Sequence, residues 1–255
     1  MIGVKILFMS KVELYQGDCL KIMKQIPDNS IDMVLCDLPY GTTQCKWDII
    51  IPFDELWKQY NRIAKENAAI VLFGTEPFSS YLRLSNIKDY RYDIIWDKIK
   101  GTGFLNAKKQ PMRNHENISI FYKKQCTYNP QKTIGHILKQ TCRKKESQTD
   151  VYGTLTKDNY YSSTERYPRS IQIFSTDTQL SALHPTQKPV KLLEYLIKTY
   201  TLENETVLDN CMGSGSTGIA CKNLNRNFIG IELDEYYFKL AKERIEKHNV
   251  SKKLF

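Results

Sequence analysis

The chain has 255 residues, and 37 Lys and Arg against 28 Asp and Glu give it a formal net charge of +9. Its 41% hydrophobic and 25% charged residues are ordinary for a globular protein and exclude wholesale disorder. The longest apolar run, Ala68–Phe73, is far shorter than the ~20 residues that cross a bilayer, so we expect no membrane segment. The seven cysteines include no C-x-x-C pair, which predicts neither a disulfide framework nor a zinc site and fits a reducing compartment.

The first part of the chain alternates between strand-like and helix-like patterns. Short apolar runs predict strands over residues 1–11, Ile31–Cys36, Ala69–Phe73, Tyr90–Trp96 and Asn117–Tyr122. Between the second and third of these, Phe53–Glu66 places apolar side chains three or four positions apart, which predicts an amphipathic helix. The stretch at residues 1–11 lacks the small-residue cleavage site of a signal peptide.

The positive charge is concentrated in one internal block, from Lys98 to Ser170. This block has 15 Lys and Arg against 5 Asp and Glu, a local excess of +10, so the rest of the chain has a net charge of −1. Phe and Tyr side chains lie among the Lys and Arg residues, and this combination suits contact with phosphates and stacking on nucleobases. A solvated, Lys-rich surface would have the same charge. Weak periodicity from Thr141 to Tyr167 predicts a loop.

After the basic block, the alternation resumes. We expect a helix over Val190–Tyr200, a strand over Thr206–Asp209, a helix through Cys221, a strand over Phe228–Glu232 and a helix over Glu235–His248. Alternation on both sides of a differently composed block predicts an α/β fold with a mostly parallel, doubly wound sheet. We expect residues 1–97 and 182–255 to form two halves of one domain, and residues 98–181 to form a basic insert.

A glycine-rich turn follows the predicted strand Thr206–Asp209. Gly213, Gly215 and Gly218 form a G-x-G-x-x-G pattern, which indicates a dinucleotide site. However, the carboxylate of Asp209 just before the turn would repel a pyrophosphate and attract the ammonium and sulfonium of S-adenosylmethionine. The glycines would let the backbone approach this ligand, and Glu232 would accept its ribose hydroxyls. A plain tight turn between strand and helix is the alternative.

A second motif, Asp37-Leu-Pro-Tyr40, follows the predicted strand Ile31–Cys36 at the edge where open α/β sheets bind ligands. It resembles the (D/N/S)-P-P-Y motif of amino-methyltransferases, with Leu38 in place of the first proline. The segment His184–Pro189, H-P-T-Q-K-P, resembles the motif before the cofactor helix in the same enzymes. The order of tetrapeptide, basic region, H-P-T-Q-K-P and glycine turn resembles that of β-group DNA N6-adenine and N4-cytosine methyltransferases.

The resemblance, over residues 1–97 and 182–248, implies a Rossmann-like methyltransferase fold whose basic insert is a target-recognition domain. It also implies methyl transfer from S-adenosylmethionine to an exocyclic amine of a flipped-out base. Such an amine is a poor nucleophile because its lone pair is delocalised into the ring. Asp37 and the Leu38 carbonyl would each accept one N–H, and Tyr40 would stack on the extruded base before an in-line displacement. By the same resemblance, an aspartate in the first motif position favours adenine N6.

The resemblance assigns a role to each candidate residue. The catalytic residues are Asp37, Leu38, Pro39 and Tyr40. The cofactor-binding residues are Asp18, Cys19, Asp37, His184, Thr186, Gln187, Lys188, Asp209, Asn210, Cys211, Gly213, Ser214, Gly215, Glu232 and Leu233. The substrate-binding residues are Tyr40, Phe73, Arg113, Arg166 and Arg169. Two assignments have alternatives, because Asp18 could cap a helix and Lys188, assigned to the cofactor's carboxylate, could simply be exposed. His115-Glu116 resembles part of another family motif, and we expect a structural role for His115.

Other functions stay open beside DNA adenine methylation. An N4-cytosine methyltransferase shares the motifs, and a non-catalytic DNA-binding regulator shares the fold. A nucleotide-dependent oxidoreductase would use the glycine turn but would leave D-L-P-Y, H-P-T-Q-K-P and the basic block unexplained. We expect double-stranded DNA as partner and no metal, and we leave a homodimer and a cognate restriction endonuclease open. The expected location is the cytoplasm of a bacterium, or of the host of a phage that encodes the enzyme.

Overall fold

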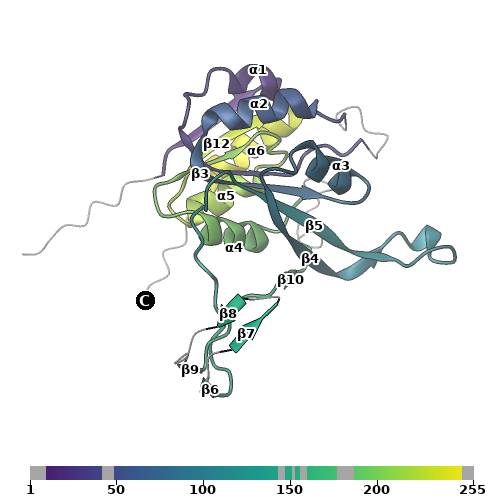
Figure 1. Ribbon diagram of the computed structural model, residues 1–255. Coiled ribbons are helices and arrows are strands. Elements are labelled where there is room, and N and C mark those ends of the chain that lie inside the picture. Colours follow the sequence, from purple (N-terminus) through teal and green to yellow (C-terminus); the bar gives the residue numbers. More distant parts are fainter. Residues whose placement is uncertain are drawn as a thin grey trace, which may run out of the picture. The chain divides into compact units, whose positions relative to one another are not determined.

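The computed structural model describes residues 10–41, 49–142, 147–150, 153–155, 160–176 and 187–248 (Figure 1). The chain divides into two compact units: Met1–Asn129 with Ser170–Phe255, and Pro130–Arg169. The larger unit contains the main sheet and its helices, and the smaller unit contains short antiparallel ribbons. Among the described residues, no helix combines the length and the apolar composition that crossing a membrane requires.

The larger unit is built on one mixed sheet, which has eight strands in the described part of the chain. Their order is β1 (Val12–Gln16), β12 (Asn227–Glu232), β11 (Thr206–Asp209), β2 (Ile31–Cys36), β3 (Ala64–Gly74), β5 (Arg113–Phe121), β4 (Tyr90–Thr102) and β10 (Ile171–Ile173). Neighbours from β1 to β3 are parallel, β5 is antiparallel to β3 and β4, and β10 is parallel to β4. The sheet is therefore largely parallel, which confirms the predicted α/β class.

Helices cover both faces of this sheet. One hydrophobic cluster joins the sheet to α1 (Cys19–Met23), α2 (Phe53–Ile63) and α3 (Phe78–Ser85). A second cluster joins the other face to α4 (Val190–Tyr200), α5 (Ser216–Asn223) and α6 (Glu235–Lys247). Figure 1 shows α1 and α2 on one side of the strands and α4 on the other. This is the doubly wound arrangement that the sequence predicts.

Burial on both faces holds the central strand β2 in place. Met33 and Leu35 pack toward α4–α6, whereas Val34 and Cys36 pack toward α1–α3. Successive residues of a strand point to opposite faces, so a strand covered on both sides needs apolar side chains at nearly every position. Each fully buried leucine or valine contributes about 1.5–3 kcal/mol. The segment that follows β2 therefore starts from a fixed point at the carboxyl edge.

The sequence predicts most elements of the larger unit. The predictions that agree with the structure at both ends are Ile31–Cys36, Val190–Tyr200 and Thr206–Asp209. The helix predicted over Phe53–Glu66 ends at Ile63, because Ala64 takes an extended conformation and begins β3. The strand predicted over residues 1–11 falls almost wholly outside the described residues, and β1 begins at Val12.

The described residues of the smaller unit form two antiparallel ribbons. In one, β6 (Lys139–Cys142) pairs with β9 (Tyr160–Ser163), and in the other β7 (Ser147–Thr149) pairs with β8 (Gly153–Leu155). The prediction of a loop over Thr141–Tyr167 was therefore wrong where the structure has the strands β6–β9. The strands are short, and β6 is exposed along its whole length, so no apolar alternation marks it in the sequence. This unit lies inside the predicted insert 98–181, whose first residues belong to β4 and β5.

Candidate active site

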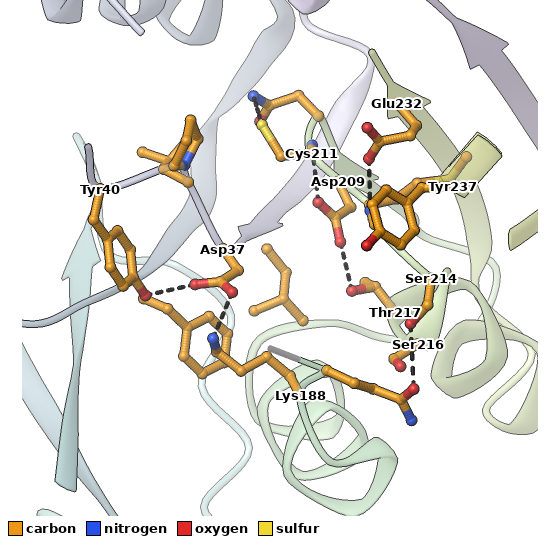
Figure 2. Close-up of a pocket in the computed structure, with 18 of the residues that line it drawn as sticks. Asp37, Tyr40, Lys188, Asp209, Cys211, Ser214, Ser216, Thr217, Glu232 and Tyr237 are labelled. Carbon is orange, nitrogen blue, oxygen red and sulfur yellow. Dashed lines mark hydrogen bonds and ion pairs between the residues drawn. The ribbon is translucent and has the colours of Figure 1, made fainter. Parts of the chain in front are cut away.

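A cavity of about 840 Å³ opens at the carboxyl ends of β2, β11 and β12, which are neighbours in the sheet (Figure 2). Asp37 follows β2, while Asp209 and Glu232 are the last residues of β11 and β12. Because parallel strands end at one edge, three carboxylates from distant parts of the sequence meet here. In Figure 2, Asp37 lies on one side of the cavity with Tyr40 and Lys188, and Asp209 and Glu232 lie on the other side.

The cavity brings together residues from each predicted motif. The predicted site residues that line it are Asp18, Cys19, Asp37, Leu38, Pro39, Tyr40, Phe73, Gln187, Lys188, Asp209, Asn210, Cys211, Gly213, Ser214, Glu232 and Leu233. The predicted residues that do not line it are Gly215, Arg113, Arg166 and Arg169, and His184 and Thr186 lie outside the described residues. The individual roles of all these residues stay predictions.

Asp37 is hydrogen-bonded through both carboxylate oxygens. The hydroxyl of Tyr40 donates to Oδ1 at 2.5 Å, and Lys188 Nζ donates to Oδ2 at 2.5 Å. Burial raises the pKa of Asp37 above its usual value, and the Lys188 ammonium opposes this rise. The side chain remains 24% exposed toward the cavity. Since each carboxylate oxygen has a second lone pair, Asp37 can accept a further N–H bond from a ligand.

Lys188 joins two carboxylates in the wall of the cavity. Its side chain is 9% exposed, and Nζ lies 2.5 Å from Asp37 Oδ2 and 3.3 Å from Glu116 Oε2. Burial acts to lower the pKa of Lys188, but the two carboxylates outweigh burial and raise it. Lys98 forms an ion pair with Glu116 Oε1. Alternating charges therefore run from Lys98 through Glu116 and Lys188 to Asp37. Contact of Lys188 with a cofactor carboxylate stays a prediction.

Glu116 is a site residue to which our sequence analysis gave no role. Burial acts to raise the pKa of Glu116, but the ammonium groups of Lys188 and Lys98 outweigh it and lower the pKa. Among the described residues, its buried Oε2 has an ion-pair neighbour but no hydrogen-bond partner. On β5, Glu116 is in phase with Ile118 and Ile120, both fully buried. An acidic residue in phase with buried isoleucines is the signal that could have identified it.

Asp209 is held by the turn that follows it. Its side chain is buried, with Oδ2 accepting from the Thr217 hydroxyl at 2.6 Å and Oδ1 accepting from the Cys211 amide at 3.2 Å. Burial raises the pKa of Asp209 to about 6, and the hydrogen bond from Thr217 opposes the rise. A cation that binds beside Asp209 would favour the charged carboxylate.

Glu232 and Asp18 also have backbone partners. Glu232 Oε2 accepts from the Gly213 amide at 2.8 Å, and Oε1 accepts from the Asp234 amide at 2.9 Å. Burial raises the pKa of Glu232. Asp18 caps α1 by accepting from the Leu20 amide at 2.8 Å. The capping alternative for Asp18 is thus confirmed, and the residue also lines the cavity.

The glycines of the turn have different neighbours. Gly213 lines the cavity and has a φ of 51°, in the left-handed region that favours glycine. A Cβ on Gly218 would lie 2.5 Å from Ile245 Cδ1 and 2.8 Å from Phe228 Cε1, so this glycine lets α5 pack closely on α6 and β12. The turn is also linked to the H-P-T-Q-K-P segment, because the Ser214 hydroxyl donates to Gln187 Oε1 at 3.4 Å.

Solved structures of DNA methyltransferases have this fold. The M1.HpyAVI complex with S-adenosylmethionine is 25% identical, with a TM-score of 0.61 over 92% of this chain and 98% of that chain. The PvuII cytosine-N4-specific DNA methyltransferase is 17% identical, with a TM-score of 0.67 over 95% of this chain and 89% of that chain. Fold and cavity thus define a Rossmann-like methyltransferase, as the sequence predicts.

Sequence comparison gives the family. The type II methyltransferase M.HinfI of Haemophilus influenzae is 29% identical over 92% of this chain and 68% of the relative. M1.MboII of Moraxella bovis is 27% identical over 90% of this chain and 94% of the relative. The model of the DNA methylase family of N6 and N4 methyltransferases matches residues 31–243, and the chain belongs to this family. It is therefore a DNA amino-methyltransferase that uses S-adenosylmethionine, which confirms the predicted family and cofactor.

Proposed function

We propose that the chain methylates the exocyclic N6 amine of adenine in double-stranded DNA. The observation that carries this proposal is the position of Asp37, which lies in the same cavity as the glycine turn and Glu232. A cavity of about 840 Å³ is in the size range of small-molecule sites, and it can hold a cofactor beside one base. Because the amine of a paired base is inaccessible inside the duplex, we propose that the adenine flips out of the stack into the cavity.

The side of the cavity that holds Asp209 fits S-adenosylmethionine. Asp209 offers a buried carboxylate to the cationic end of the cofactor, and Glu232 offers one to the ribose hydroxyls. Gly213 presents backbone without a side chain, while Cys19 and Leu233 provide apolar surface for the adenine ring of the cofactor. The bound cofactor supplies an electrophilic methyl group at its sulfonium.

Asp37 and Leu38 orient the target amine. The carboxylate and the Leu38 carbonyl each accept one N–H, which directs the nitrogen lone pair away from the ring. Lys188 holds Oδ2 of Asp37 at 2.5 Å and stabilises the charged carboxylate. The amine loses a proton as it gains the methyl group, and Asp37 is in position to take it because the same N–H already bonds to its carboxylate.

Tyr40 and Phe73 provide aromatic surface for the flipped base. The Tyr40 ring is held from two directions, by its hydrogen bond to Asp37 and by Phe78, whose ring centroid lies 4.9 Å away. A ring fixed in this way is ready to stack on a base without further loss of freedom. Phe73 lines the cavity with Lys188 Nζ 5.2 Å from its ring centroid.

The basic block provides the proposed contacts with the DNA backbone. Arg113 and Arg169 are exposed. Arg166 donates to the carbonyls of Ser163 at 2.9 Å and Ile137 at 2.6 Å within the smaller unit, so part of its hydrogen-bonding capacity is already used. Affinity for DNA should fall with salt by a log–log slope of about 0.9 per phosphate contacted. A flat salt dependence would favour the solvated-surface alternative.

The choice of adenine rests on the aspartate in the first motif position. Incubation of the protein with labelled S-adenosylmethionine and unmethylated DNA, followed by digestion to nucleosides, tests it. We expect label in N6-methyladenine. Label in N4-methylcytosine alone would overturn the adenine assignment and leave the family activity in place. No label in DNA would overturn the proposal as a whole and favour a DNA-binding regulator.

A further inference from the structure

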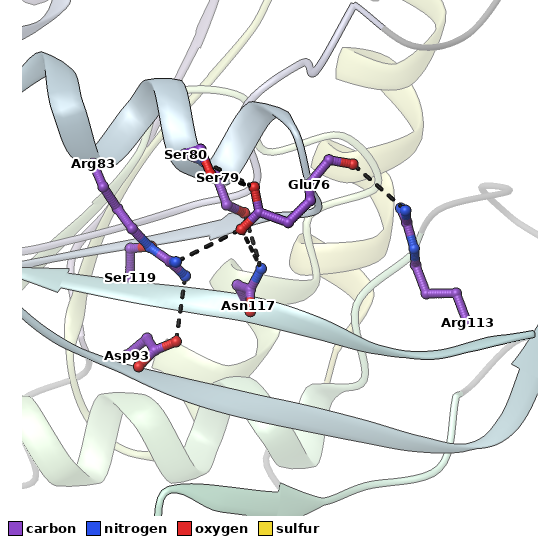
Figure 3. Close-up of polar contacts among 8 residues, drawn as sticks. All are labelled: Glu76, Ser79, Ser80, Arg83, Asp93, Arg113, Asn117 and Ser119. Atoms are coloured by element: carbon purple, nitrogen blue, oxygen red, sulfur yellow. Dashed lines mark hydrogen bonds and ion pairs between the residues drawn. The ribbon is translucent and has the colours of Figure 1, made fainter. Parts of the chain in front are cut away.

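The strands β4 and β5 extend beyond the rest of the sheet as a two-stranded arm, which we define as Lys98–His115 (Figure 1). At its base, the Thr102 hydroxyl donates to the Arg113 carbonyl at 3.0 Å. Arg113 Nη2 donates to the carbonyl of Glu76 at 3.5 Å, and the Glu76 carboxylate accepts from the Ser80 hydroxyl at 2.6 Å at the start of α3 (Figure 3). These contacts join the base of the arm to the main sheet and α3.

The arm carries only positive charge. Its basic residues are Lys98, Lys100, Lys108, Lys109 and Arg113, and the sequence from Lys98 to His115 contains no Asp or Glu. Lys98 is paired with Glu116 inside the cavity wall, whereas the other four are exposed. An arm with four exposed cations and no anion is complementary to a polyanion such as the phosphate backbone of DNA.

The tip of the arm exposes two large apolar side chains next to each other. Phe104 is 78% exposed and Leu105 is 96% exposed. The tip is nevertheless an ordered turn, because Gly103 has a φ of 87°, the Asn106 amide donates to the Gly103 carbonyl at 2.9 Å, and the Gln110 amide donates to the Asn106 carbonyl at 3.0 Å. Apolar side chains fixed in water by an ordered turn gain stability only when a partner covers them.

The base of the arm lines the cavity. Lys100, Gly101 and Thr102 are part of the cavity wall, and Phe104 follows two residues after Thr102. At about 3.3 Å per residue, Phe104 stands within ~7 Å of that wall along the chain, which is about two base-pair steps of duplex DNA. A duplex that delivers a base to the cavity would therefore bring its neighbouring base pairs to the tip.

We propose that this arm enters the DNA duplex and that Phe104 and Leu105 insert between bases beside the flipped adenine. The exposed lysines and Arg113 hold the flanking phosphates. Apolar side chains inserted at a base step unstack it and occupy space that an extruded base leaves, which lowers the cost of flipping. The proposal rests on the proposed function, because it assigns to the arm a part in bringing the base to Asp37.

The test compares the double variant Phe104→Ala/Leu105→Ala with a matched control, Leu84→Ala/Ile87→Ala. The control residues are also large, apolar and exposed, but they lie away from the arm. Leu84 is 69% exposed and belongs to α3, and Ile87 is 61% exposed and follows α3. We would measure kcat/KM for unmethylated genomic DNA with tritiated S-adenosylmethionine, cofactor affinity by calorimetry, and thermal unfolding. Loss of stacking should lower kcat/KM for the arm variant by about tenfold, with cofactor affinity and melting temperature unchanged. The control should remain near the wild-type value.

A second variant tests the charges. Lys108→Gln/Lys109→Gln should lower the log–log salt slope of affinity for a random-sequence duplex by about 0.9 for each phosphate that the variant no longer neutralises. For the first variant, Phe104→Ala/Leu105→Ala, a kcat/KM equal to that of the wild type would overturn the proposal that the arm inserts into DNA and would leave the proposed function intact. Loss of cofactor affinity or of thermal stability in that variant would assign the tip a structural role instead. A change in oligomeric mass with unchanged DNA kinetics would assign it to contact between copies. If wild-type protein labels no DNA, the proposed function fails first and the arm proposal fails with it.

Discussion

The ammonium group of Lys188 lies 2.5 Å from Asp37 Oδ2, although 151 positions separate the two residues in the sequence. Asp37 follows the end of β2, and Lys188 lies two residues before Val190, the first residue of α4. The contact therefore joins two distant segments of the larger unit at the carboxylate to which we assign the chemistry. Glu116 fixes Lys188 from the other side.

Replacing Lys188 should shift the pH dependence of methylation. Asp37 can take the amine proton, and accepts the N–H bond most strongly, when it is ionised, and the Lys188 ammonium lowers its pKa. In Lys188→Met, the pKa of Asp37 should rise, so the acid limb of kcat/KM for DNA should move upward by about one pH unit or more. The control is Lys191→Met, which removes an exposed lysine three residues further along the chain. An unmoved acid limb would show that Lys188 does not act on Asp37.

Replacing Glu116 should shift the same limb in the opposite direction. The charge of Glu116 raises the pKa of Asp37, so Glu116→Gln should move the acid limb downward, by about one pH unit or less. The variant should also be less stable, because Lys98 loses its ion-pair partner. pH profiles of Glu116→Gln and Lys188→Met, measured side by side, check the signs. A shift of both in the same direction would contradict the electrostatic role of this chain of charges.

Asp209 should make cofactor binding sensitive to acid. Its pKa is raised to about 6 by burial, so the charged form that attracts a cation is present above that pH and is lost as the pH falls through it. Calorimetric affinity for S-adenosylmethionine should therefore fall below about pH 6. Thr217→Val removes the hydrogen bond that lowers the pKa and should move the midpoint to higher pH. The control is Ser216→Ala, which removes a hydroxyl that accepts a hydrogen bond from Arg244. It should leave the pH midpoint of cofactor affinity unchanged.

Gly218 should be required for stability more than for contact with the cofactor. A Cβ there would meet Ile245 Cδ1 at 2.5 Å and Phe228 Cε1 at 2.8 Å. Gly218→Ala should lower the free energy of unfolding by about 1–3 kcal/mol, measurable by denaturant titration. Shortening Ile245 to valine in the same protein removes the nearest atom and should restore part of that free energy. A variant as stable as the wild type would show that α6 moves aside at little cost.

The predictable part of the site is the part that a strand end determines. Asp37, Asp209 and Glu232 each follow an apolar run, and the period and length of such runs identify buried parallel strands. Parallel strands share one carboxyl edge, so three separate sequence positions predict one cavity. The helices that pack on the sheet are also predictable, because apolar side chains three or four positions apart identify them, as in Val190–Tyr200.

The part that could not be predicted depends on contacts between distant segments. Nothing local relates Lys188 to Asp37 or to Glu116, and the three come from separate segments of the larger unit. The arm was likewise hidden, because its charge merged with that of the basic block until β4 and β5 separated it from Pro130–Arg169. Gly218 matches a ligand-binding pattern in sequence, yet its closest neighbours are Ile245 and Phe228.

The most direct test of the central claim is the nucleoside composition of genomic DNA from a methylation-free bacterium that expresses either wild-type protein or Asp37→Ala. Asp37→Ala removes the oxygens that accept the amine N–H, whereas asparagine would keep an acceptor. We predict N6-methyladenine with the wild type and none with the variant, while the purified variant still binds S-adenosylmethionine. Equal amounts of N6-methyladenine from both proteins would contradict the role of Asp37 in orienting the adenine amine.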